Sequence, residues 1–124
     1  MSDREFDIVV WGATGFTGAL VAEYLLERYG VGNELRWAIA GRSEDKLAAL
    51  KNELGSEAAD LPVVVADSFD EDKLAAMAAS TRVVITTVGP YAKYGSPLVA
   101  ACVEHGTHYC DLAGEAQWIR QMVD

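Results

Sequence analysis

The sequence predicts a doubly wound α/β fold, in which a parallel β-sheet is covered by helices on both faces. Short apolar runs rich in branched residues alternate with helical patterns from end to end of the chain. These runs are nearly continuous rather than alternating with polar residues, which is typical of strands buried on both faces. Right-handed crossovers then give three layers, α/β/α, and the strand order 3-2-1-4-5, with a crevice between the first and fourth strands.

The first half of the chain starts with "FDIVVWG" (6–12), a buried strand that ends at a glycine. A helix is expected over 16–30, because its apolar residues recur at helical spacing and Gly30 can end it. "LRWAIAG" (35–41) is the second strand. The helix over 43–55 begins at Ser43 as its N-cap, has acids in its first turn and stops at Gly55.

The second half continues the alternation. "LPVVVAD" (61–67) is a third strand and "DEDKLAAMAAS" (70–80) a third helix. "TRVVITTVG" (81–89) is a fourth strand, rich in β-branched residues. A fourth helix over 96–106 carries Pro97 near its first turn, and the chain ends with a short strand and the start of another helix, at 107–114 and 115–124.

Length and charge limit the class of protein. The 124 residues suit one domain, 1–124, in which 51% of residues are apolar. The formal net charge of −9 argues against nucleic acid as a partner, because phosphate binding needs a basic face. No apolar run reaches the ~18 residues that span a bilayer, and the charged start "MSDREFD" is unlike a secretory signal, so a cytoplasmic protein is expected. A homodimer is compatible with these features.

The cysteines and histidines predict neither a disulfide framework nor a metal site. Cys102 and Cys110 form no CxxC pair, so both are expected to be buried, reduced thiols. His105 and His108 flank Gly106, which indicates a turn, and no convincing carboxylate or thiol stands with them. No metal is expected.

The turn "GATGFTG" between the first strand and first helix predicts a Rossmann-type dinucleotide site. Gly12 permits a tight turn, Gly15 lets a pyrophosphate approach the amides at the helix N-terminus, and Gly18 permits close packing of the helix on the sheet. The alternative is that these glycines only shape the connection. The candidate cofactor-binding residues of this turn are Gly12, Thr14, Gly15, Phe16, Thr17 and Gly18.

The end of the second strand, "AGRSEDK", indicates the identity of the dinucleotide. An acid here would accept from a ribose 2′-hydroxyl, whereas Arg42 offers a fork of donors to a 2′-phosphate. Ser43 adds a hydroxyl and an amide, and Lys46 a second positive charge. The cofactor is therefore predicted to be NADP(H), with an exposed arginine of no specific role as the alternative.

The ends of the third and fourth strands complete the predicted site. Asp67, followed by Ser68, lies where the adenine edge is expected, although Asp67 could instead cap the third helix. The residues expected to line the pyrophosphate and the nicotinamide ribose are Thr87, Val88, Gly89, Pro90 and Tyr91.

Several motifs then support a resemblance to a known family. In order they are "WGATGFTG", the "AGRS" turn, "VGPYxxYG" and the "ACxxxGTHYxDLxGE" run. Across the whole chain the sequence resembles the saccharopine-dehydrogenase-like oxidoreductases, and within them the trans-acting enoyl reductase branch. The resemblance implies an amino-terminal NADP-binding domain of a longer oxidoreductase, whose second domain shapes the site for a small-molecule substrate.

The resemblance also suggests residues near the chemistry. By position, Tyr91, Tyr94 and Gly95 would lie beside the nicotinamide, and the far wall would contain Asp111, Gly114 and Glu115. Tyr91 and Tyr94 are candidate proton donors, although packing is a common role for such aromatic residues. No other catalytic residue is assigned. In the full-length protein, hydride transfer to an enoyl, imine or carbonyl substrate is implied.

Two other interpretations remain open. An extended short-chain reductase or epimerase shares the glycine spacing, but its Tyr-x-x-x-Lys pair is missing: the fourth residues after Tyr91, Tyr94 and Tyr109 are Gly95, Leu98 and Ala113. A non-catalytic NADP(H)-binding redox sensor would have the same glycine turn and the same Arg42. Only its behaviour in the full-length context distinguishes it from an enzyme.

Overall fold

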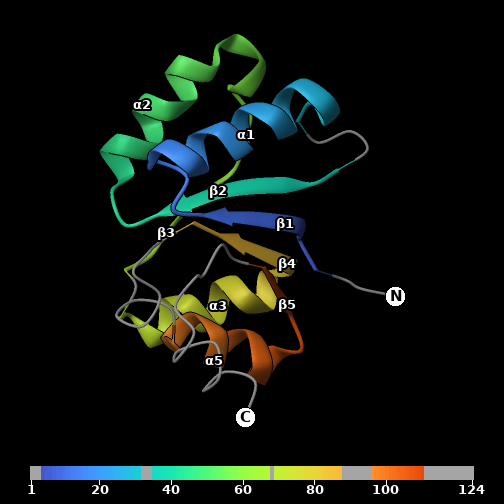
Figure 1. The fold of residues 1–124 in the computed structure, drawn as a ribbon, viewed down its shortest axis with the longest axis vertical. Coiled ribbons are helices and arrows are strands. Elements are labelled where there is room, and N and C mark those ends of the chain that lie inside the picture. Colours follow the sequence, from blue (N-terminus) through green and yellow to red (C-terminus); the bar gives the residue numbers. More distant parts are fainter. Residues whose placement is uncertain (1–3, 32–34, 68, 88–95, 111–124) are drawn as a thin grey trace.

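The computed structural model describes residues 4–31, 35–67, 69–87 and 96–110, and it confirms the predicted sheet. The five strands are all parallel and lie in the order β3-β2-β1-β4-β5 (Figure 1). Their bounds are Phe6–Trp11 (β1), Trp37–Gly41 (β2), Val63–Val65 (β3), Thr81–Thr86 (β4) and His108–Cys110 (β5).

The helices also fall where the sequence places them. They are α1 (Phe16–Tyr29), α2 (Glu44–Leu54), α3 (Glu71–Ser80) and α5 (Ser96–His105), with a short 3₁₀ turn, η1, at Ser56–Ala58. Gly30 and Gly55 follow the last residues of α1 and α2, as predicted, and both have positive φ. The helix expected over 115–124 and the end of the strand expected over 107–114 lie outside the described residues.

The helices form two layers, one on each face of the sheet. Figure 1 shows α1 and α2 on one side and α3 and α5 on the other. Because side chains alternate along a strand, β1 contributes Val9 and Trp11 to the core beneath α3 and α5, and Val10 to the core beneath α1 and α2. All three are almost completely buried, so the carboxyl end of β1 is packed against a helix layer on each face of the sheet.

Arg4, just before β1, joins segments that are far apart in sequence. Its guanidinium donates to the carbonyl oxygen of Thr81 at 2.6 Å, to the carbonyl of His105 and to the hydroxyl of Thr107. These acceptors lie where α3 passes into β4 and where α5 passes into β5. Because a guanidinium has five donors, one side chain satisfies several carbonyls at the amino edge of the sheet.

Asp7 makes a second polar connection at this edge. Its carboxylate accepts from the backbone amide of Arg36 at 3.0 Å and lies 3.3 Å from the Arg36 guanidinium. The backbone hydrogen bond, and then the charges of Arg36 and Arg82, lower the pKa of Asp7 against the opposing effect of burial. The ion pair therefore connects the start of β1 to the segment leading into β2.

The two cysteines differ, which corrects one prediction. Cys102 on α5 is buried, and burial raises the pKa of its thiol to about 11, whereas Cys110 at the end of β5 is exposed. Both are free thiols. Cys110 lies on the edge strand, on the sheet face opposite α5, which the described helices do not cover at β5. Within the described residues, no helix is long and apolar enough to cross a bilayer.

Candidate cofactor site

The glycine turn lies at the carboxyl edge of the sheet, between β1 and α1. Gly12 has φ of 82°, a left-handed conformation that other residues adopt at a cost. Its amide donates to the carbonyl of Ala40 at 2.9 Å, and the amide of Ala13 donates to the same oxygen at 3.2 Å. The turn is therefore fixed to the end of β2, and these two amides are used within the fold.

The other two glycines of the turn are required for different reasons. A Cβ atom at Gly18 would lie 2.1 Å from the carbonyl oxygen of Gly12 and 2.8 Å from the Cα of Ala13. Gly18 thus lets α1 pack directly on the glycine turn. The sequence had predicted that it lets the helix pack on the sheet. A Cβ atom at Gly15 would meet only the Gly12 oxygen, at an ordinary 3.5 Å. The fold itself therefore does not require a glycine at position 15.

The start of α1 provides backbone donors and no competing side chain. Gly15 is the N-cap, so no side chain caps the helix, and no acidic residue lies in the first turn. The first helical hydrogen bond runs from the amide of Ala19 to the carbonyl of Gly15, so the preceding amides of the first turn have no intrahelical acceptor. Thr14, Phe16 and Thr17 are exposed around them. Such a terminus fits an anionic group.

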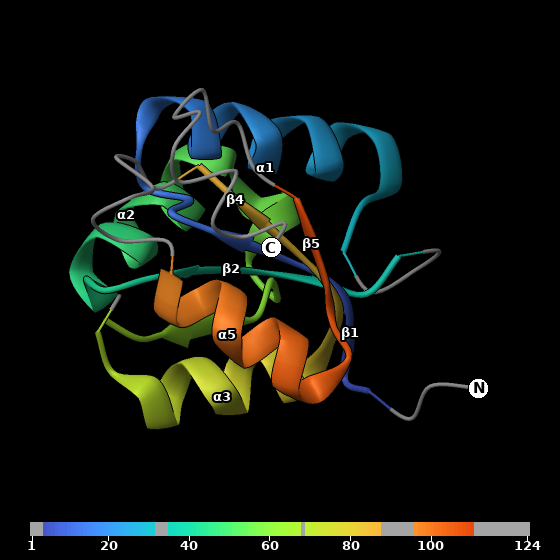
Figure 2. The same cartoon turned by 60° about the horizontal axis from the view of Figure 1, so that its bottom comes forward.

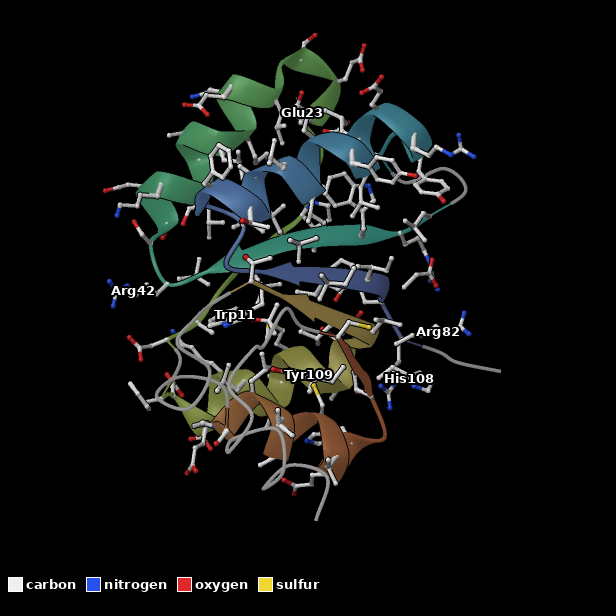
Figure 3. The ribbon with its side chains drawn as sticks, in the orientation of Figure 1. Trp11, Glu23, Arg42, Arg82, His108 and Tyr109 are labelled. Atoms are coloured by element: carbon white, nitrogen blue, oxygen red, sulfur yellow. The ribbon has the colours of Figure 1, made fainter. Side chains whose placement is uncertain are left out.

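At the end of β2 the structure confirms Ser43 as the N-cap of α2. Its hydroxyl accepts from the amide of Lys46 at 3.3 Å. Arg42 is exposed and projects away from the sheet (Figure 3), and its guanidinium makes no hydrogen bond or ion pair with the described residues. Lys46 is also exposed and shares a small hollow of about 210 Å³ with Thr14. Lys46 thus lies beside the glycine turn, and Arg42 lies at the end of the neighbouring strand, β2.

The end of β3 decides one alternative. The carboxylate of Asp67 accepts from the amide of Phe69 at 3.0 Å, while Asp70 is the N-cap of α3 and accepts from the amide of Lys73 at 3.2 Å. The suggestion that Asp67 caps this helix is therefore wrong, because the N-cap is Asp70, three residues later. Asp67 is exposed in a turn at the carboxyl edge.

The end of β4 contacts the glycine turn directly. Thr87 donates from its amide to the carbonyl of Trp11 at 3.2 Å and from its hydroxyl to the carbonyl of Gly12 at 3.3 Å. Thr87 and the glycine turn therefore meet where β1 and β4 end side by side, the place at which the sequence predicted a crevice. The remaining predicted site residues lie outside the described residues: Ser68, Val88, Gly89, Pro90, Tyr91, Tyr94, Gly95, Asp111, Gly114 and Glu115.

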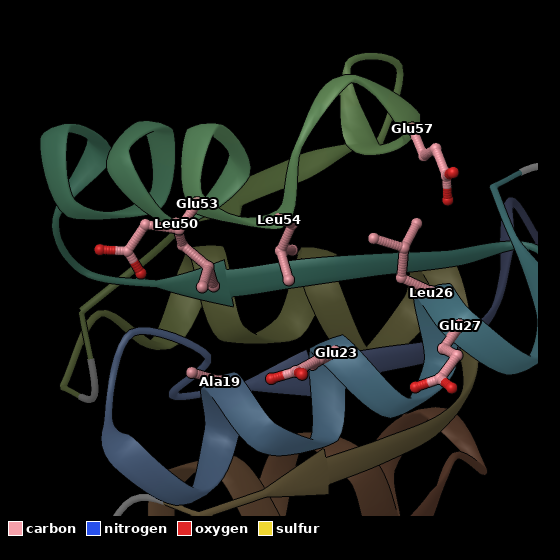
Figure 4. Close-up of a pocket in the computed structure, with 8 residues that line it drawn as sticks. All are labelled: Ala19, Glu23, Leu26, Glu27, Leu50, Glu53, Leu54 and Glu57. Atoms are coloured by element: carbon pink, nitrogen blue, oxygen red, sulfur yellow. The ribbon is translucent and has the colours of Figure 1, made fainter.

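A larger groove lies elsewhere, between α1 and α2 (Figure 4). It has a volume of about 400 Å³ and an apolar floor, with carboxylates from both helices and η1 around it: Glu23, Glu27, Glu53 and Glu57. This groove is on the outer side of the helices rather than at the carboxyl edge of the sheet. Its four carboxylates would repel the phosphates of a dinucleotide, so it is not the cofactor site.

Comparison with known proteins identifies the family. The family model described as the saccharopine dehydrogenase NADP binding domain matches residues 8–123. The chain belongs to this family. It is an NADP-binding domain of the saccharopine dehydrogenase type, as the motifs predicted, and its cofactor is NADP(H). A glycine turn with an uncapped helix start and an adjoining arginine fits the phosphates of that cofactor.

Curated relatives add a narrower similarity. The chain is 50% identical over 123 residues to a protein named trans-acting enoyl reductase from Mycobacterium tuberculosis. It is 47% identical over 123 residues to one of the same name from Mycobacterium ulcerans. In both cases 99% of this chain is matched but only 29% of the relative. The chain therefore spans less than a third of these proteins.

Solved structures support the fold of this saccharopine dehydrogenase-type domain. Apo saccharopine dehydrogenase (L-Glu forming) from Saccharomyces cerevisiae matches with a TM-score of 0.68 at 16% identity, covering 95% of this chain and 24% of that one. A short-chain dehydrogenase/reductase from Veillonella parvula in complex with NADP matches with a TM-score of 0.63 at 17% identity, covering 86% of this chain and 46% of that one. At these identities the likeness shows the fold alone.

Proposed function

We propose that this domain serves an NADPH-dependent reductase that acts on an enoyl substrate. Half of the residues are identical, over nearly the whole chain, to proteins named enoyl reductases, and this observation carries the proposal. The chain spans 29% of those relatives, so the substrate and the reaction belong to the longer protein. Imine and carbonyl substrates, which the resemblance also allowed, are less well supported by the names of these relatives.

Within this domain we assign the pyrophosphate to the start of α1. The exposed hydroxyls of Thr14 and Thr17 and the first-turn amides of α1 are the donors, and Gly15 leaves room for the phosphate oxygens. Gly12 and Gly18 act indirectly, by holding the turn and the helix in contact. Phe16 contributes its backbone amide, since its side chain is 82% exposed.

We assign the 2′-phosphate of the adenosine ribose to Arg42, with Ser43 and Lys46 beside it. The exposed guanidinium, which has no partner among the described residues, is available for a bidentate contact, and the Ser43 hydroxyl can donate while it accepts from Lys46. Asp67 lies at the next strand end, where its free carboxylate oxygen can accept from the adenine amine. The nicotinamide side is proposed for Thr87 and, outside the described residues, for Val88, Gly89, Pro90 and Tyr91.

Reduction of an enoyl group places a hydride on the carbon β to the carbonyl and a proton on the α carbon. The nicotinamide supplies the hydride, so the protein has to position the two partners and supply the proton. Tyr91 and Tyr94 are the candidate proton donors, and Asp111, Gly114 and Glu115 the candidates for the far wall of the pocket. We expect residues 1–124 alone to bind NADPH without reducing a substrate, because water exclusion around the nicotinamide needs a second wall.

The experiment that tests this function compares two proteins. Full-length protein and the 124-residue chain are each mixed with NADPH and an α,β-unsaturated thioester, and NADPH oxidation is followed by absorbance. Substrate-dependent oxidation by the full-length protein alone is the expected result. Tight binding without oxidation of any enoyl, imine or carbonyl compound would instead support the redox-sensor interpretation.

Cytoplasmic location, a homodimeric state and the absence of nucleic-acid binding remain predictions from the sequence. The domain is proposed to extend over residues 1–124, slightly beyond the 8–123 that the family model matches. The acidic net charge of −9 supports the expectation about nucleic acid.

A further inference from the structure

Among the residues that the structure describes, one face of the sheet is covered over β1 and β2 but open over β4 and β5. Ile39, Val10, Ile85 and Cys110 are neighbours in one row across four strands, on the face that carries α1 and α2. Ile39 and Val10 are completely buried, Ile85 is half-buried and Cys110 is exposed. Burial therefore falls along the row in the direction of β5.

The neighbouring row repeats this gradient. Trp37, Ile8, Val83 and His108 are register partners on the same face. Trp37 is buried, Ile8 and Val83 are half-buried and His108 is exposed. Two adjacent rows with the same trend show that the open region belongs to the face and not to one side chain.

The opposite face has no such opening. There Val9 and Val84 are register partners and both are completely buried beneath α3 and α5. Tyr109, the next residue in that row, packs against the same core. The edge position of β5 alone therefore does not explain the exposure of its other face.

Helix α1 forms a wall beside the open region. The side of α1 that faces α2 carries Ala19, Glu23 and Leu26, which line the groove between these helices. Val21 and Tyr24 lie on the opposite side of the helix, by the helical repeat. That side faces β4, because β2 and β4 flank β1 in the sheet. Tyr24 is 59% exposed.

We propose that this open corner, formed by Val83, Ile85, His108 and Cys110 with Val21 and Tyr24 of α1, is a docking site for an apolar segment of the same polypeptide outside residues 1–124. Parallel sheets occur almost only with both faces covered. The relatives are more than three times longer than the segment matched here, 29% of their length, so the covering segment has a source. It would pack aliphatic or aromatic side chains on Val83 and Ile85.

A strand added next to β5 would not close the corner. The crossover from β4 to β5 puts α5 on the face of α3, and a further right-handed crossover in the same direction puts its helix on that face too. The occupant must therefore return to the face of α1 from elsewhere in the longer protein.

The reactivity of Cys110 in full-length protein tests the proposal. The protein is treated with iodoacetamide, and the extent of modification at Cys102 and at Cys110 is followed over time by mass spectrometry. Buried Cys102 reports that the domain stays folded. In wild type we expect Cys110 to react slowly, and Val83→Glu to accelerate it about tenfold or more while Cys102 stays protected. Val103→Glu is the matched control, because Val103 on α5 is 76% exposed and lies outside the corner.

His108→Glu is the second variant, since His108 is exposed in this chain and its replacement removes no buried contact within the domain. It should also accelerate Cys110. Rapid alkylation of Cys110 in wild-type full-length protein would overturn the proposal, as would protection that disappears on dilution, which would indicate a second copy as the occupant. The assay contains no nucleotide, so its result is independent of the proposed reductase function.

Discussion

Helices α1 and α2 both begin at the carboxyl edge of the sheet, but their first turns are built differently. The N-cap of α2 is Ser43, and the first turn carries Glu44 and Asp45. The N-cap of α1 is Gly15, with no side-chain cap and no acid in the first turn. The positive end of α2 is thus compensated by its own residues, whereas that of α1 is left for a ligand.

This difference explains why the two phosphate positions need different groups. At α1, the backbone amides can hold the pyrophosphate without any cation nearby. At α2, Glu44 and Asp45 oppose a negative ligand, so a 2′-phosphate there requires a positive side chain. We propose that Arg42, immediately before the cap, supplies it in a chain with formal net charge −9.

The largest expected effect is on folding, from Gly18→Ala. The new Cβ would lie 2.1 Å from the Gly12 oxygen, a backbone atom that cannot move without opening the turn. Ordinary overpacking costs about 1–3 kcal/mol, and this contact should exceed that range, lowering Tm by about 10 °C or more. Thermal unfolding measures it. A Tm within about 2 °C of wild type would show that the turn is not held as described.

Gly15→Val should separate binding from folding. Gly15 has φ −76° and ψ 167°, which valine adopts readily, and its Cβ has ordinary contacts. We expect a folded domain that has lost NADPH binding, because the side chain would occupy the position of the pyrophosphate. Calorimetric titration with NADPH and the far-UV circular dichroism spectrum check the two halves of this prediction. Unchanged affinity would remove the start of α1 from the site.

Ser43→Ala addresses the cap of α2. Loss of the hydrogen bond to Lys46 should lower the free energy of unfolding by about 1 kcal/mol, the usual value of an N-cap. Urea denaturation measures this change. Asp70→Ala, which removes the equivalent cap of α3, is the matched control and should cost a similar amount. A stability equal to wild type for Ser43→Ala would contradict the view that α2 is capped by its own residues.

The smallest effect concerns Asp7, away from both helix starts. The folded state lowers its pKa below the ordinary 3.8, so Asp7 stabilises the fold above that pH. This stabilisation is lost as the pH falls through the lower, folded-state pKa. Asp7→Asn should therefore flatten the acid limb of the stability profile, measured by urea unfolding between pH 6 and pH 3. An unaltered acid limb would show that the pair with Arg36 contributes nothing.

The fold could be predicted from the sequence because its signals are local. Continuous apolar strands, Ser43 as a cap and glycines after two helices each report on a few neighbouring residues, and all were confirmed. Gly18 was recognised as a close contact, but which backbone it meets depends on the three-dimensional turn. Local pattern also left Asp67 as a possible cap of α3, a position that Asp70 holds in the structure.

Long-range contacts could not be predicted in the same way. Arg4 bonds to groups 77 and 103 positions away, at Thr81 and Thr107, and nothing in the local sequence "DREF" marks it as an anchor. Thr87 was expected to line the cofactor site, and the local sequence did not show that its hydroxyl donates to Gly12 within the fold. The exposure of Cys110 follows from which face of the sheet is covered, and the sequence of this segment does not specify that.

The most direct test of the difference between α1 and α2 is the ratio of the dissociation constants for NADPH and NADH, at fixed salt, in wild type and Arg42→Ala. Removing a charge-assisted contact at a partly exposed site should cost roughly 1.5–3 kcal/mol, or about ten- to a hundredfold in NADPH affinity. NADH affinity should barely change, because NADH lacks the 2′-phosphate. Arg42→Asp should go further and favour NADH over NADPH, because the carboxylate repels the 2′-phosphate and can accept from the ribose hydroxyls. If Arg42→Ala weakens both nucleotides equally, Arg42 supports the shared pyrophosphate or the fold, and the assignment of the 2′-phosphate to α2 is wrong.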